Sequence, residues 1–290
     1  MILRSLVMVV AVAVALAGCA GKKPVVPADQ LWTEANEAYD DEAYDYAIQR
    51  YKALLDQYPF DSHAEEAELK IAQAYYNADR FPEAIAAFGN FERMHPTSTY
   101  LPTTEYHRGL SYMAQYTTSD RDQQAVTNAL NTFRNIVDRF PGTPWADRSV
   151  LRIRECREAL AQHEAQVASY YLQRKSWRAA ESRLRGLLTE YPETDAAAET
   201  LYTFGQSYDE REEQEGAVLA YSTLVRHFPD DERVKDARTH LDPDKDPNAT
   251  DPLPQLLAYL SSASTRPDRT AVPRTVSAYP DRGDASGSRY

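Results

Sequence analysis

The hydrophobic positions of this chain recur in one spaced set that appears five times. The set contains a bulky residue, an alanine, a second bulky residue, an apolar residue and a proline, at steps of 3, 4, 3 and 5. At about 100° per residue, the first four positions lie on one side of a helix, and the proline marks where that helix stops. The pattern therefore predicts five similar helices. The copies are Tyr44-Ala47-Tyr51-Leu54-Pro59, Phe81-Ala84-Phe88-Phe91-Pro96, Val126-Ala129-Phe133-Ile136-Pro141, Trp177-Ala180-Leu184-Leu187-Pro192 and Gln214-Ala217-Tyr221-Leu224-Pro229.

A second signature precedes each of these helices. A small residue is followed three positions later by a tyrosine or, in the first copy, by an alanine. In four units the small residue lies nine residues before the first position of the next helix, which leaves room only for a tight turn. The two helices of a unit must then be antiparallel, and the small residue lets them approach closely. The pairs of residues are Ala35 with Ala38, Ala72 with Tyr75, Gly109 with Tyr112, Ala168 with Tyr171, and Gly205 with Tyr208.

Five helical pairs in one register, each closed by a proline, resemble the tetratricopeptide repeat. Such units stack on their neighbours and typically form surfaces that bind other proteins. We therefore predict an all-α tetratricopeptide-repeat superhelix of about five helical pairs. The alternative is an ordinary helical bundle without true repeats.

Two departures from the regular spacing divide the predicted superhelix. In the third unit, eight extra residues lengthen the loop between the helices, around residues 116–122. Between Pro141 and Ala168 the interval is 27 residues instead of 13. That interval predicts a long linking helix over about 147–175, roughly 40 Å in length. The helix would join N-terminal repeats at 31–141 to C-terminal repeats at 147–241.

The amino end reads as an export signal followed by a lipid-attachment site. Residues 1–18 contain Arg4 and then an apolar run over 6–17, which is too short to span a bilayer. The run ends at Leu16-Ala17-Gly18-Cys19, which resembles the lipobox of bacterial lipoproteins. That resemblance implies that Cys19 carries an S-diacylglycerol and an N-acyl chain, which together hold a protein stably on a membrane. An ordinary cleaved signal with an incidental Cys19 is the alternative.

Both ends outside the repeats are expected to be flexible. Residues 19–30 look like a tether, and Ala20 after the modified cysteine, by the sorting rule for lipoproteins, points to the periplasmic face of the outer membrane. Residues 242–290 are rich in Pro, Asp, Ser, Thr and Arg, which predicts a disordered tail. Within that tail, Leu253 to Leu260 either folds as a short helix against a partner or is an accident of composition.

Charge and motifs argue against several classes of function. The net charge is −12 and no basic face is evident, so a nucleic-acid partner is not expected. The sequence contains no phosphate-binding glycine loop, no nucleophile elbow and no His-Glu-x-x-His pair, and its histidines are scattered. We predict no enzymatic activity, no metal and no cofactor apart from the lipid on Cys19. Cys156 then has no disulfide partner and is interpreted as a buried apolar residue.

Several stretches resemble the BamD family, lipoproteins of the outer-membrane β-barrel assembly machinery. The resemblance covers roughly residues 19–240, including the enlarged loop and the long helix, and leaves out the tail. The stretches are Tyr58-Pro59-Phe60, Ala74-Tyr75-Tyr76-Asn77, Arg108-Gly109-Leu110, Ser119-Asp120-Arg121-Asp122, Val167-Ala168-Ser169-Tyr170-Tyr171 and residues 190–194.

The resemblance implies a non-enzymatic scaffold. Proteins of this family bind a periplasmic domain of the β-barrel insertase through their C-terminal repeats, and their N-terminal repeats receive unfolded barrel proteins. Other lipoproteins of the assembly complex are further partners. Arg183 occupies the place of a family arginine at the insertase contact, although a solvent-exposed helix arginine needs no partner.

The repeat register also predicts a polypeptide-binding groove along the first helices of the N-terminal repeats. Aromatic rings there would take side chains of an extended segment, and amides would hold its backbone groups. Each ring could instead simply pack between helices. The predicted groove residues are Trp32, Asn36, Tyr39, Leu69, Gln73, Tyr76, Asn77 and Tyr106.

Two other functions compete with the assembly scaffold. Lipoproteins that pilot secretin or pilus assembly also carry tetratricopeptide repeats, and a helical superhelix can carry a peptidoglycan-cleaving enzyme. The loop at 119–122 and the long linking helix favour the assembly scaffold.

Overall fold

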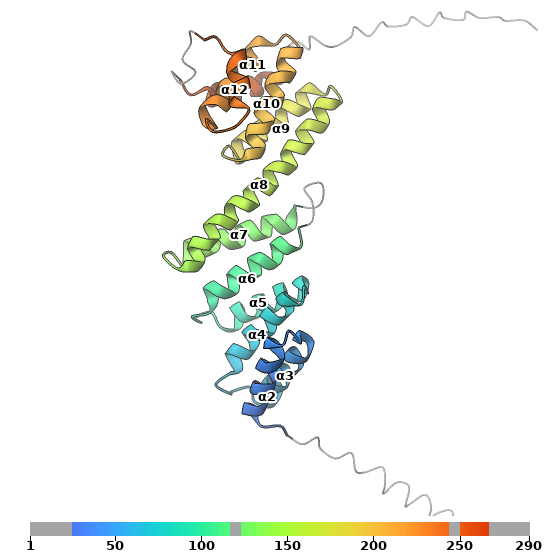
Figure 1. The fold of residues 1–290 in the computed structure, drawn as a ribbon, viewed down its shortest axis with the longest axis vertical. Helices are drawn as coiled ribbons and strands as arrows, with labels where there is room; N and C mark the ends of the chain where they lie inside the picture. Colours follow the sequence, from blue (N-terminus) through green and yellow to red (C-terminus); the bar gives the residue numbers. More distant parts are fainter. Residues whose placement is uncertain (1–24, 117–122, 244–249, 267–290) are drawn as a thin grey trace, which may run out of the picture. The chain divides into compact units, whose positions relative to one another are not determined.

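The computed structural model describes residues 25–116, 123–243 and 250–266. The chain divides into two compact units, and the division falls between Ile153 and Arg154. Helices account for the regular structure of both units (Figure 1). The predicted signal peptide at 1–18, the predicted lipid site Cys19 and most of the enlarged loop lie outside the described residues.

The first unit is a stack of antiparallel helical pairs. From α2 to α7, each helix packs against its neighbours in the sequence, as Figure 1 shows. The first turns of the long helix α8 also belong to this unit. The helices are α2 (Ala28–Asp40), α3 (Tyr44–Gln57), α4 (Ala64–Asn77), α5 (Phe81–Met94), α6 (Leu101–Ala114), α7 (Gln124–Arg139) and α8 (Pro144–Gln173).

The second unit contains two further pairs and a set of short C-terminal helices. The later turns of α8 share a buried core with α9, and α10 pairs with α11. Helix α13 packs across α9 and α11. The elements are α9 (Trp177–Glu190), α10 (Asp195–Glu210), α11 (Gln214–His227), α12 (Val234–Ala237), η1 (Arg238–His240), α13 (Pro252–Ser261) and η2 (Ser262–Ser264).

The second helix of each pair begins where the repeated set predicts. Helices α3, α5, α9 and α11 start at the first residue of their copies, and α7 starts two residues earlier. The third position of every copy is 0% exposed, because it lies in the middle of the apolar stripe. The predicted all-α fold of five tetratricopeptide-type pairs is therefore confirmed. The third-position residues are Tyr51, Phe88, Phe133, Leu184 and Tyr221.

The tight turns inside four of the pairs share one backbone conformation. In each turn a residue with φ between 56° and 59° ends the first helix. The N–H of the next residue then bonds a carbonyl five residues back, as Ala43 does to Ala38 at 2.8 Å. This is the Schellman arrangement of helix ends. The repeated turn confirms the antiparallel pairing that the nine-residue spacing predicts. The left-handed residues are Glu42, Asp79, Lys175 and Glu212.

The structure moves three predicted boundaries. Helix α8 is close to the predicted range of 147–175, but the two units divide within it and not between residues 141 and 147. Helix α2 already begins at Ala28, so residues 28–30 are not part of a tether. The prediction of a disordered tail is wrong for residues 252–264, which form α13 and η2, because Leu256 and Leu260 are buried against the second unit.

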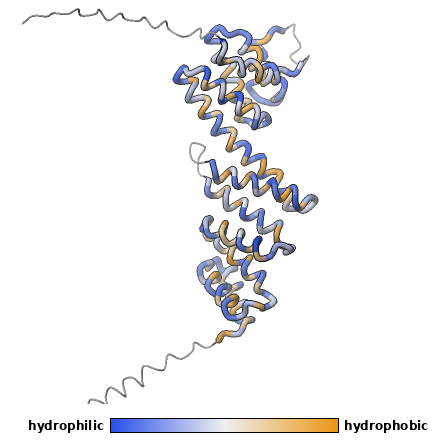
Figure 2. The backbone as a smooth tube through the Cα atoms, turned by 180° about the vertical axis from the view of Figure 1, so that it is seen from behind, coloured by the Kyte–Doolittle hydropathy of each residue, from blue (hydrophilic) through white to orange (hydrophobic). Residues whose placement is uncertain are grey.

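Hydrophobic and hydrophilic residues alternate along the described helices (Figure 2). This pattern is expected for helices that pack on one face and meet water on the other. Within the described ranges, the structure contains no helix whose length and hydropathy would let it cross a membrane. Cys156 on α8 is fully buried, as predicted.

Candidate functional site

The first helices of the first unit carry a surface of aromatic rings and amides. Helices α2, α4 and α6 and the first turns of α8 each open a new layer of the stack, and several of their polar and aromatic side chains remain at least partly exposed. We call these side chains the first-helix surface. They are Trp32, Asn36, Tyr39, Lys70, Gln73, Tyr76, Asn77, His107 and Trp145.

Tyr39 and Asn77 join the first two pairs across this surface. The side-chain nitrogen of Asn77 donates a hydrogen bond of 2.8 Å to the hydroxyl of Tyr39. The ammonium group of Lys70 lies 4.4 Å from the centroid of the Tyr39 ring, within cation–π distance. Burial raises the pKa of Tyr39, so its hydroxyl stays protonated at neutral pH. The neutral side chain of Tyr39 therefore connects α2 to α4 through its contacts with Asn77 and Lys70.

Trp32 and Asn36 are half-buried at the amino end of the stack. The ring of Trp32 stacks on His63 with the ring centroids 4.6 Å apart. The amide of Asn36 donates to the carbonyl of Trp32 at 3.0 Å and accepts from the hydroxyl of Tyr51 at 2.8 Å. Asn36 is thus already satisfied within the protein, so its side chain mainly fixes the ring of Tyr51.

A second cluster of rings joins α4, α6 and α8. The ring centroid of His107 lies 6.0 Å from that of Tyr76 and 5.7 Å from that of Trp145. Nδ1 of His107 donates to the carbonyl of Thr103 at 2.8 Å, and burial lowers the pKa of His107, so the imidazole is neutral at neutral pH. Burial also raises the pKa of Tyr76. The rings of the cluster are therefore uncharged, and two cations lie near them: the Arg148 guanidinium is 4.8 Å from the Trp145 ring, and the charge of Arg152 acts on Tyr76.

Gln73 lies on α4 between Lys70 and Tyr76. Its side chain is half-buried and makes no hydrogen bond within the part of the chain that the structure describes. A primary amide carries both a donor and an acceptor. Gln73 can therefore pair with the backbone of an extended polypeptide laid across the rings.

Two of the predicted groove residues lie in the core instead. Leu69 is 4% exposed and packs in a cluster with Phe88 and Phe91. Tyr106 is 7% exposed, and its ring lies 5.6 Å from that of Phe133. The prediction that these two residues line an open groove is wrong. The repeat register gives the side of the helix on which a residue lies, but not how far the second helix of the same pair covers that side.

The sequence reasoning did not place Lys70, His107 and Trp145 on this surface. In the sequence, His107 is one of several scattered histidines, and nothing in its spacing marks it as a surface residue. A signal for Trp145 exists, because α8 begins three residues after Pro141, in the place where a first helix follows its terminal proline. Treating the start of the long helix as a first helix would have assigned Trp145 to the surface.

Arg183 lies in the second unit, on α9. Its side chain is 45% exposed, and its guanidinium lies 3.2 Å from a carboxylate oxygen of Glu164 on α8. The insertase contact of Arg183 and the lipid on Cys19 stay predictions. In the described ranges, no group of three or more His, Cys, Asp or Glu side chains could hold a metal ion.

Comparisons with known proteins agree with this description. The family described as YfiO, Outer membrane lipoprotein, matches residues 24–221. The chain is 31% identical over 208 residues to the Outer membrane protein assembly factor BamD of Vibrio cholerae, covering 67% of this chain and 86% of that protein. It is 27% identical over 246 residues to the protein of the same name from Neisseria meningitidis serogroup B, covering 78% of this chain and 92% of that protein.

Among solved structures, the TPR2AB domain of yeast Sti1 in its pHSP90 complex is similar with a TM-score of 0.40 at 14% identity, covering 81% of this chain and 98% of that chain. The names of the two BamD relatives describe an assembly factor and no catalytic activity, in line with the prediction of no enzyme. The family match runs from the start of the first unit through most of α11. The chain therefore belongs to the YfiO family of outer membrane lipoproteins.

Proposed function

We propose that this protein is a lipid-anchored scaffold subunit of the outer-membrane β-barrel assembly complex. In this role it binds unfolded outer-membrane proteins and the β-barrel insertase. The name that its relatives share, Outer membrane protein assembly factor, supports the role. The observation that carries the proposal for this chain is the first-helix surface, in which rings and amides from successive pairs lie on neighbouring first helices.

The chemistry of this surface suits an unfolded strand of a membrane barrel. Burial keeps Tyr39, Tyr76 and His107 neutral, so their rings offer amphipathic contact area without net charge. Strands of such barrels alternate apolar and polar side chains. Apolar side chains of the strand would lie on the rings, and its backbone would pair with the amide of Gln73.

The second unit is proposed to bind the insertase through Arg183. An exposed guanidinium presents several donors in a planar fork that matches a carboxylate. Its present partner is Glu164 on the neighbouring helix, at 3.2 Å. Because exposed ion pairs are weak, a carboxylate of the partner can replace Glu164 at little cost.

The anchor is proposed to be the acylated Cys19, on the periplasmic face of the outer membrane. Two or three acyl chains suffice for stable membrane attachment. Pro27, the residue before α2, lies eight positions after Cys19 in the sequence. Fully extended, that segment reaches about 28 Å. The first unit would therefore stay close to the membrane where barrels are inserted.

Depletion of the protein from the bacterium that encodes it tests the proposal. We expect the levels of folded outer-membrane barrels to fall, while an α-helical inner-membrane protein, as the control, keeps its level. Normal barrel levels together with lost pili would support a pilus-piloting lipoprotein instead. Release of muropeptides by the purified protein would support a peptidoglycan-cleaving enzyme.

A further inference from the structure

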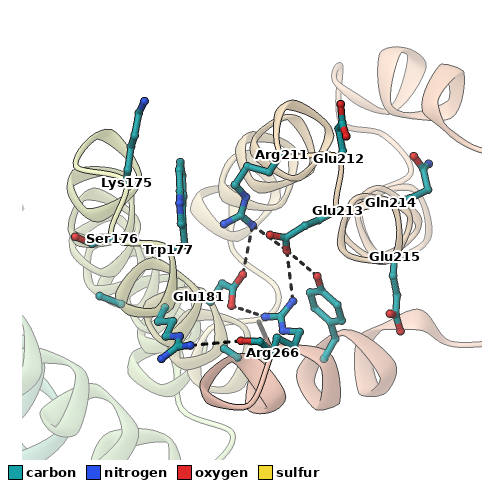
Figure 3. Close-up of a pocket in the computed structure, with 14 residues that line it drawn as sticks. Lys175, Ser176, Trp177, Glu181, Arg211, Glu212, Glu213, Gln214, Glu215 and Arg266 are labelled. Atoms are coloured by element: carbon teal, nitrogen blue, oxygen red, sulfur yellow. Dashed lines mark hydrogen bonds and ion pairs between the residues drawn. The ribbon is translucent and has the colours of Figure 1, made fainter. Parts of the chain in front are cut away.

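The second unit contains a pocket of about 650 Å³ where the start of α9, the turn between α10 and α11, and the end of the C-terminal segment meet (Figure 3). Acidic and basic side chains line it together with the rings of Trp177 and Tyr259. The pocket takes no part in the proposed function.

Two glutamates and two arginines alternate inside this pocket, as the dashed lines of Figure 3 show. Arg211 lies 3.4 Å from Glu181 and 3.3 Å from Glu213. Arg266 pairs with Glu181 as well, and it lies 3.6 Å from Glu213. Each carboxylate therefore bridges the two guanidinium groups.

Aromatic rings cover both guanidinium groups. Arg211 lies 4.5 Å from the centroid of the Trp177 ring, and Arg266 lies 3.6 Å from that of Tyr259. The hydroxyl of Tyr259 also donates to Glu213 at 3.0 Å. Aromatic faces and carboxylates are the groups that recognise a guanidinium ion. The pocket is therefore built to hold arginine.

Arg266 belongs to a segment that binds the repeats like a ligand. This segment, residues 251–266, contains α13, whose side chains Leu256 and Leu260 are 0% and 3% exposed in the core of the second unit. A Cβ atom at Gly216 on α11 would lie 2.9 Å from the hydroxyl of Tyr259 and equally close to the ring of Tyr208 on α10, so the glycine makes room for both rings. The whole segment lies beyond the residues that match the family.

Without the segment, the pocket would have fewer positive charges to balance its two glutamates. Glu181 is 3% exposed, and burial raises its pKa despite both arginines. Without Arg266, two glutamates would face Arg211 alone, and a buried unpaired carboxylate is costly. The empty pocket would therefore attract another cationic side chain.

The segment is suited to leave the pocket and to be replaced there by another polypeptide. Helix α13 has only ten residues, and a helix of that length is not stable on its own in water. Its docking must therefore order the segment at the same time as it forms the contacts, which lowers the net affinity.

We propose that the face formed by α9, α11 and this pocket is a docking surface for an amphipathic helix followed by an arginine, and that residues 251–266 occupy it in cis. A partner polypeptide with the same pattern, two leucines one helical turn apart and then an arginine, binds there only when the segment leaves. The C-terminal segment thus competes with that partner.

A synthetic peptide of residues 250–266, carrying a fluorophore, tests this in the full-length chain. The double variant Leu256→Glu/Arg266→Glu changes only the segment and should release it, which faster amide hydrogen exchange over 252–261 would show. We expect the peptide to bind this variant about ten-fold or more tightly than the wild type, because cis occupancy lowers the apparent affinity. Arg238→Glu, the same charge change at an exposed site in η1, should behave like the wild type.

A peptide with Arg266→Glu should bind the double variant about ten-fold or more weakly, since it brings a third carboxylate into the pocket. Equal binding of the native peptide to the wild type and the double variant would overturn the proposal, as would failure to bind a variant whose segment is released. If the double variant does not fold, Arg266→Ala alone replaces it. Unchanged exchange of α13 in that variant would show that Arg266 does not hold the segment, and would also overturn the proposal.

Discussion

The ring of Tyr221 on α11 occupies the space that Gly205 leaves on α10. A Cβ atom added at Gly205 would lie 2.4 Å from Cε1 of Tyr221, closer than two carbon atoms can approach. The same relationship joins Gly109 on α6 to Phe133 on α7, at 2.6 Å. In these pairs the glycine of the first helix and the ring at the third position of the second helix set how closely the two helices pack.

We expect Gly205→Ala to destabilise the second unit. The ring of Tyr221 is fully buried and its hydroxyl bonds Asp209 at 3.1 Å, so it cannot move aside freely. Overpacking of a core costs about 1–3 kcal/mol, offset in part by about 1 kcal/mol of better helix propensity. Urea unfolding should show a net loss of up to about 2 kcal/mol in the free energy of unfolding.

Gly186→Ala is the matched control, because it makes the same substitution inside α9 where a Cβ would meet nothing within 4 Å. It should leave the free energy of unfolding unchanged or raise it by up to about 1 kcal/mol. Equal effects of the two substitutions would show that the contact with Tyr221 is not what limits the approach of the helices.

The stability of the first unit should depend on the protonation of Glu92. Burial raises the pKa of Glu92 to about 7, although Arg108 lies 2.9 Å from its carboxylate. A carboxyl whose folded pKa exceeds its unfolded value binds more protons in the folded state. The folded first unit therefore loses stability relative to the unfolded state as the pH rises from about 4.5 through about 7. Relative to Glu92→Gln, the wild type should lose up to a few kcal/mol over that range.

Denaturant unfolding at several pH values between about 4.5 and 8 measures this difference. Glu92→Gln keeps the shape of the side chain and its ability to accept from Arg108, so it isolates the effect of the charge. Stability profiles of the two proteins that run parallel across the range would contradict the raised pKa.

Replacement of Arg183 should weaken binding of the insertase without affecting the fold. The side chain is 45% exposed and its pair with Glu164 is a surface ion pair, so Arg183→Ala should change the free energy of unfolding by less than about 1 kcal/mol. Its affinity for the periplasmic domain of the insertase should fall about ten-fold, the loss typical of a charge-assisted contact. Arg185→Ala, at an exposed position on the same helix, should leave that affinity unchanged; a similar loss in both variants would argue against a specific contact.

Substitution of the proposed lipid site should release the protein from the membrane. Cys19→Ser removes the thiol that would carry the diacylglycerol. Without acyl chains, the protein lacks the hydrophobic anchor that would hold it on the membrane. Metabolic labelling with a radioactive fatty acid should label the wild type and not the variant, and fractionation should find the variant away from the membrane. Labelling that persists in the variant would show that the lipid is attached elsewhere.

Local spacing predicts the repeated pairs well because each pair is held by contacts between residues close in sequence. The start of α5 at Phe81 and the burial of Phe88 both follow from one periodic set. Spacing does not predict depth, so the prediction places Leu69 and Tyr106 on a surface, although the second helix of each pair buries them.

Contacts between distant parts of the sequence were invisible to the same reasoning. Helix α13 lies in a stretch rich in proline and charge, whose average composition conceals Leu256 and Leu260. The pocket that joins Arg211 to Arg266 through shared carboxylates depends on the fold of the whole second unit. No local pattern brings these two residues together.

Site-specific photocrosslinking from Gln73 tests the central claim, that the first-helix surface binds unfolded barrel polypeptides. A photoreactive residue would replace Gln73, and as the control it would replace Ala86, which is exposed on the second helix α5. The probe is a labelled peptide from the carboxyl-terminal strand of an outer-membrane barrel protein. The account predicts crosslinks from position 73 that unlabelled peptide competes away, and none from position 86. Equal yields at the two positions, or no crosslink from position 73, would contradict it.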